Sequence, residues 1–67
     1  MEIKKVFAKD VKEGYIAQIE VAPCVFSKVK IENIENDGIQ IFFSFYNNGK
    51  YQEVGYFSNS ILSVYNI

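Results

Sequence analysis

Apolar and polar residues alternate along most of this 67-residue chain, in short stretches that end at turn-forming residues. Alternation with a period of two predicts half-buried β-strands. Glycines at positions 14, 38, 49 and 55 help to divide the stretches. The predicted strands cover residues 3–9, 15–21, 26–35, 39–47, 50–57 and 62–65. The pattern therefore predicts an all-β protein of five or six short antiparallel strands, folded as one domain over residues 1–67.

The turn at residues 36–38 determines how two of these strands pair. If these residues form a three-residue loop with Gly38 in the left-handed conformation, Ile31 lies opposite Phe43. A two-residue loop would instead place Glu32 opposite Phe43 and bring charge into the apolar face. Because a shift of one residue moves every side chain to the other face, the three-residue loop is favoured.

The pair Asn48-Gly49 is a strong signal for a two-residue type I′ turn. This turn places Tyr46 opposite Tyr51 and Phe42 opposite Gly55, where a bend of the sheet is expected. The two hairpins together predict a three-stranded sheet with an apolar face that the remaining strands cover, as in a small barrel or sandwich. Its outward face is expected to carry aromatic and basic side chains, namely Lys28, Lys30, Phe42, Tyr46 and Tyr51.

A strand, a turn with Asp10, Lys12 and Gly14, a second strand, a three-stranded meander, a polar turn and a short last strand follow one another. This order resembles SH3-like small barrels over most of the chain, and the resemblance implies a small antiparallel barrel. The aromatic pair and acidic loop by which signalling SH3 domains bind proline-rich peptides are not recognisable, and the chain has no tryptophan. The resemblance therefore implies a fold and no particular ligand.

The charge and side-chain inventory exclude several kinds of chemistry. The net charge is −1, and all seven basic residues are lysines, four of them within residues 1–12. Duplex-binding proteins normally have a basic excess and use arginine to read guanine, so this balance argues against duplex nucleic acid. Without histidine, the usual general base and the commonest zinc ligand are missing, and Cys24 as the single cysteine cannot complete a tetrahedral sulfur/nitrogen zinc site. No glycine-rich phosphate loop is present.

The chain is therefore expected to be a non-catalytic protein without metal or cofactor. Cys24 is expected to be a small buried hydrophobe. A lone cysteine and the lack of a long apolar run predict a cytoplasmic protein that does not insert into a membrane. The lysine-, isoleucine- and asparagine-rich usage hints at a low-GC bacterium or its phage. If the gene belongs to a phage, a binder of this size would act as an inhibitor of a host protein.

Six phenylalanines and five tyrosines are more than one small core needs. Tyrosine buries a large area and keeps a polar tip, which favours recognition surfaces. The leading hypothesis is a protein-interaction module that associates with itself as a homo-oligomer through Lys28, Lys30, Phe42, Tyr46 and Tyr51. Two alternatives stay open, a protein that sequesters a nucleotide-like small ligand and a single-stranded nucleic-acid-binding domain. Simple cross-strand packing of the aromatic side chains is a third explanation.

Overall fold

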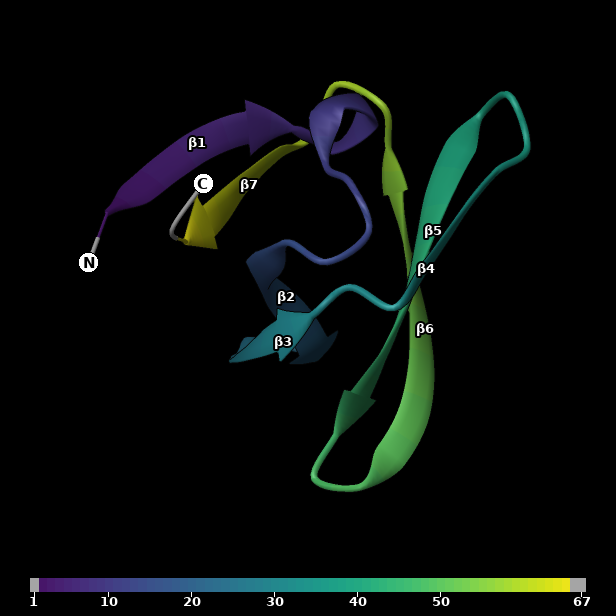
Figure 1. Ribbon diagram of the computed structural model, residues 1–67. Coiled ribbons are helices and arrows are strands. Elements are labelled where there is room, and N and C mark those ends of the chain that lie inside the picture. Colours follow the sequence, from purple (N-terminus) through teal and green to yellow (C-terminus); the bar gives the residue numbers. More distant parts are fainter. Residues whose placement is uncertain (1, 66–67) are drawn as a thin grey trace.

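Strands form most of the part of the chain that the computed structural model describes, residues 2–65 (Figure 1). The elements in chain order are β1 (Ile3–Phe7), the 3₁₀ helix η1 (Ala8–Asp10), β2 (Ile16–Ala22), β3 (Val25–Lys30), β4 (Asn33–Asn36), β5 (Gln40–Asn47), β6 (Lys50–Phe57) and β7 (Ile61–Tyr65). The all-β prediction is confirmed. The outermost ends of the predicted domain, residues 1, 66 and 67, lie outside the described residues.

The strands form two antiparallel sheets whose inner faces enclose the core. One sheet has the order β1-β7-β2-β3 and the other has the order β4-β5-β6. Figure 1 shows β1 and β7 of the first sheet on the left and the second sheet as a long twisted meander on the right. The core consists of buried side chains from both sheets and from η1, namely Ala8, Val11, Ala17, Ile19, Val29, Ile31, Ile41, Phe43, Phe45, Leu62 and Val64.

The strand predicted over residues 26–35 is two strands, and its predicted pairing is wrong. β3 ends at Lys30 and pairs with β2, whereas β4 begins at Asn33 and pairs with β5. Ile34, and not Ile31, lies opposite Phe43. The apolar alternation itself changes phase here, because Ile31 is buried at an odd position and Ile34 is partly buried at an even one. This change allows the chain to cross from one sheet to the other while still burying Ile31.

The loop between β4 and β5 is also shorter than expected. The backbone N–H of Asp37 donates to the carbonyl of Gln40 at 3.1 Å, so Gly38 and Ile39 form a two-residue turn. Oδ1 of Asp37 accepts the backbone N–H groups of Ile39 at 2.8 Å and of Gln40 at 2.7 Å. The predicted left-handed conformation of Gly38 is confirmed by its φ of 93°. The Asp37 carboxylate thus stabilises the shorter turn, and β4 and β5 pair in a register that differs from the predicted one.

This arrangement predicts a pH-dependent contribution of Asp37 to stability. The two backbone donors at Gln40 and Ile39 hold the pKa of the Asp37 carboxyl below its usual range. The folded state therefore favours the ionised form, and its contribution is fully present above the unfolded pKa of about 3.9. It is lost as the pH falls through the lower, folded pKa. In thermal melts, the stability difference between the natural chain and Asp37→Asn should be constant near neutral pH and should shrink below about pH 4.

Glu13→Gln is the matched control, because Glu13 is an exposed carboxylate in the loop before β2. A difference between the natural chain and Asp37→Asn that stays the same down to the acid range would contradict the role assigned to the carboxylate.

The hairpin between β5 and β6 has the predicted register. Phe43 lies opposite Val54, Tyr46 opposite Tyr51 and Phe42 opposite Gly55. Asn48 and Gly49 have φ values of 53° and 81°, as a type I′ turn requires. The Phe42 ring covers Gly55 so closely that a Cβ there would lie 2.8 Å from Cε1 of Phe42.

Cys24 is exposed, so the prediction that it is buried is wrong. Ala22 pairs with Val25, and Pro23 and Cys24 form the turn between β2 and β3. In a type II turn, proline is common at the first central position and the residue at the second has a positive φ. The φ of Cys24 is 61°, as this turn type requires. The backbone N–H of Cys24 donates to Oε2 of Glu20 at 2.9 Å. The thiol therefore sits at the tip of a turn and away from the core.

Candidate functional site

The five residues predicted to form one binding surface lie on two different sheets. Lys28 and Lys30 belong to β3, whereas Phe42, Tyr46 and Tyr51 belong to β5 and β6. The separation follows from the break between β3 and β4, which transfers the chain from one sheet to the other. The structure keeps the three aromatic side chains together and places both lysines elsewhere.

The outer face of the β4-β5-β6 sheet combines aromatic and acidic side chains. Tyr46 and Tyr51 are 60% and 55% exposed, and their rings meet edge-on with centroids 4.9 Å apart. Phe42 lies opposite Glu35 on β4 and opposite Gly55 on β6, so its side chain shares a face with Glu35. Glu53 lies on the same face, because it is opposite Ser44. We call this surface the acidic aromatic face, defined by Glu35, Phe42, Tyr46, Tyr51, Glu53 and Phe57.

The outer face of the β1-β7-β2-β3 sheet is the second candidate surface. Ile3, Phe26 and Ile61 are 58%, 55% and 62% exposed, and together with neighbouring apolar side chains they form an exposed apolar patch. Strand pairing places Phe7 opposite Ile61, and both Ile3 and Ile16 opposite Tyr65. We call this surface the basic apolar face, defined by Ile3, Lys5, Phe7, Ile16, Phe26, Lys28, Lys30, Ile61 and Tyr65.

Basic groups on and beside this face lie over its aromatic rings. Nζ of Lys28 is 4.6 Å from the centroid of the Tyr65 ring, and Nζ of Lys9 is 5.6 Å from the centroid of Phe7. Both distances are within the range of cation–π attraction. The Tyr65 hydroxyl donates to Oε1 of Gln18 at 3.0 Å, which fixes the orientation of the ring. Each end of the β1–β7 ladder therefore carries an aromatic ring with a lysine beside it.

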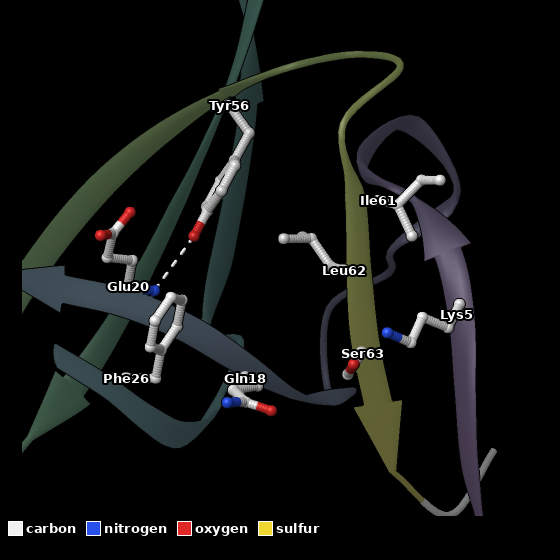
Figure 2. A pocket seen from close by; sticks show the side chains of 8 residues that line it. All are labelled: Lys5, Gln18, Glu20, Phe26, Tyr56, Ile61, Leu62 and Ser63. Carbon is white, nitrogen blue, oxygen red and sulfur yellow. Dashed lines mark hydrogen bonds between the residues drawn. The ribbon is translucent and has the colours of Figure 1, made fainter. Parts of the chain in front are cut away.

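A groove opens on this face where β2 and β7 separate (Figure 2). The two strands pair only at Ile16–Tyr65 and Ala17–Val64. Beyond these pairs lies a hollow of about 280 Å³ between the strands, and Tyr56 of β6 reaches into it from the other sheet. The Tyr56 hydroxyl accepts the backbone N–H of Glu20 at 3.0 Å. The groove is lined by Lys5, Gln18, Glu20, Phe26, Tyr56, Ile61, Leu62 and Ser63.

A second hollow of about 230 Å³ lies beside β1 and η1. It is lined by Lys5, Val6, Phe7, Asp10 and Ile61, so it shares Lys5 and Ile61 with the groove. The two hollows make the basic apolar face uneven: the groove has a mixed lining with Lys5, Gln18, Glu20 and Ser63, whereas the second hollow is mostly apolar. Such an arrangement can bind an apolar side chain or a negatively charged group of a partner.

The sequence pattern of the central meander predicts one exposed aromatic surface there, and the basic apolar face was not predicted. The available signal was the composition of the outer strands. In Ile61–Tyr65 both phases of the alternation contain large apolar residues, since Leu62 and Val64 are buried while Ile61 and Tyr65 face outward. A strand with large apolar residues on both faces has one face in the core and leaves the other one apolar and exposed.

Among residues 2–65, no group of three or more histidine, cysteine, aspartate or glutamate side chains is placed to hold a metal ion. Helices with the length and apolar character needed to cross a membrane do not occur in this part of the chain either. Comparisons of the chain with protein-family models, with curated proteins and with solved structures found no match. The resemblance to SH3-like barrels therefore stays a prediction.

Proposed function

We propose that the protein is a non-catalytic protein-interaction module of the cytoplasm that associates with itself. The observation that carries this proposal is the cluster of exposed large apolar side chains on the outer face of β1, β7, β2 and β3, with two hollows between them. Exposed isoleucines and phenylalanines cost free energy in water, and association removes that cost.

The size of the patch supports an interface. A fully buried aromatic side chain removes about 150–250 Å² from water, so five half-exposed apolar side chains present on the order of 500 Å². The largest apolar patch of a typical monomer is about 300–600 Å² and often functional. The five side chains are Ile3, Phe7, Ile16, Phe26 and Ile61.

Light scattering at increasing protein concentration tests this proposal. The measured mass should rise above the 7.7 kDa of one chain. The double variant Phe26→Ser/Ile61→Ser should raise the concentration needed for association at least about tenfold, because two exposed apolar side chains that line the groove are lost. Ile39→Ser is the matched control, since Ile39 is exposed in the loop between β4 and β5 and lies outside both faces. A strict monomer at high concentration would overturn self-association.

A second candidate function rests on the lysines and aromatic rings that share the basic apolar face. Single-stranded nucleic acids bind where bases stack on aromatic rings and lysines contact phosphates. This combination is present on β3, which carries Phe26, Lys28 and Lys30, and on β7, which carries Tyr65. Both strands pair with β2. A titration with oligo-dT at several salt concentrations separates the two functions, because nucleic-acid affinity must fall steeply as salt rises.

A further inference from the structure

We infer that the partner of the basic apolar face is the acidic aromatic face of a second copy of the same chain, bound head to tail. This inference rests on the proposed function and adds which surfaces meet. The two faces are complementary in charge and in side-chain type, and each lies on the outside of a different sheet.

Charge is divided between the two sheets. The outward strand positions of the β1-β7-β2-β3 sheet hold Lys5, Lys28 and Lys30 against Glu20. The outward positions of β4, β5 and β6 hold Glu35 and Glu53 and no lysine. Two copies that met through the basic apolar face alone would bring lysines together, whereas a head-to-tail contact pairs lysines with glutamates. Complementary potentials of this kind select the partner and its orientation.

The apolar parts of the two faces also complement each other. The acidic aromatic face projects Tyr46, Tyr51 and Phe57, all of them more than half exposed. The basic apolar face is hollowed at two places, by about 280 and 230 Å³. Each hollow has many times the roughly 30 Å³ that one water occupies in the liquid, so either can take a side-chain tip of the neighbouring copy. Tyrosine at such a contact buries its ring and keeps its hydroxyl at the rim.

The positions of the faces leave room for two contacts on each copy. A standard interface takes about 800 Å² from each partner, which is less than a fifth of the 4502 Å² surface of one chain. The inner faces of the sheets enclose the core, so their outer faces point away from each other (Figure 1). A contact between two different patches of this kind is heterologous, and it continues to a ring or an open filament instead of ending at a dimer.

Charge reversal on one face at a time tests the pairing. The variants are Lys5→Glu/Lys30→Glu on the basic apolar face and Glu35→Lys/Glu53→Lys on the acidic aromatic face, all at exposed positions. Lys28 is left in place because it contacts the Tyr65 ring. In light scattering, each double variant should raise the concentration for assembly at least about tenfold. Lys12→Glu and Glu13→Lys, exposed in the loop before β2, are the controls and should leave assembly unchanged.

The decisive sample is the chain that carries all four substitutions. Its two faces have exchanged their charges and are complementary again, so it should assemble as the natural chain does, with masses beyond that of a dimer. If the natural chain assembles but Glu35→Lys/Glu53→Lys has no effect, or if the four substitutions together do not restore assembly, the head-to-tail pairing is wrong and the proposed self-association stands. If the natural chain stays monomeric at high concentration, both proposals fail.

Discussion

Phe43→Ala is expected to unfold a large fraction of the molecules. The Phe43 side chain is fully buried in the core, where its ring lies 6.1 Å from the ring of Tyr56. Truncating a buried phenylalanine to alanine costs about 3–5 kcal/mol. At about 0.05–0.15 kcal/mol per residue, a chain of this length has only about 3–10 kcal/mol of stability in total. Urea denaturation followed by circular dichroism should therefore show a midpoint close to zero denaturant, or no folded baseline.

Phe57→Ala is the matched control for this substitution. Phe57 ends β6, the strand adjacent to Phe43, and its side chain is mostly exposed. The same truncation there should change the free energy of unfolding by less than about 0.5 kcal/mol. Both variants should be compared at a concentration at which neither associates, because association would add to the apparent stability. Equal losses for the two variants would mean that the core is not where the structure places it.

Gly55→Ala is expected to destabilise the protein even though alanine usually suits a strand better than glycine. Replacing glycine restricts the unfolded chain and contributes about 0.4–1 kcal/mol of stability. The added Cβ would lie 2.8 Å from Cε1 and 3.0 Å from Cδ1 of Phe42, so the ring has to move. Overpacking of this kind costs about 1–3 kcal/mol. We expect a net loss of about 1–2 kcal/mol in chemical denaturation.

A double-mutant cycle with Phe42→Ala separates the two contributions. Without the ring, the Cβ at position 55 no longer meets Cε1 and Cδ1 of Phe42, and Gly55→Ala should become neutral or stabilising. If Gly55→Ala is equally costly in both backgrounds, the cost does not come from the ring. The cycle therefore measures the coupling free energy between a side chain at position 55 and the ring of Phe42.

The parts of the fold that were predictable are those that local chemistry determines. The Asn48-Gly49 turn specifies a two-residue hairpin, and the whole β5–β6 register follows from it. The turn after Asn36 was harder to predict, because the Asp37 carboxylate accepts two backbone N–H groups and so stabilises a shorter turn than the expected loop. The boundary between β3 and β4 was missed because the apolar residues on both sides of it belong to the same core. The prediction of Cys24 as buried failed because residue type was given more weight than its position after Pro23.

The candidate site shows the same limit. Pairing within one hairpin brought Tyr46 and Tyr51 together as predicted, since that contact is local. The basic apolar face joins residues from β1, β2, β3 and β7. The turn at Pro23 and Cys24 connects β2 to β3, but β1 and β2 each pair with β7, which lies far from both in the sequence. The face depends on the order of strands in the sheet, and sequence alternation does not contain that order.

The Tyr56 ring gives the groove between β2 and β7 a property that the two strands alone would lack. Its hydroxyl takes the backbone donor of Glu20 that a neighbouring strand would otherwise bind, as Figure 2 shows. For β2 and β7 to close along their full length, this phenol would have to leave and its hydrogen bond would have to break. Tyr56 therefore keeps β2 and β7 separated along the groove. The groove is already open, so binding of a partner there does not require free energy to separate β2 from β7.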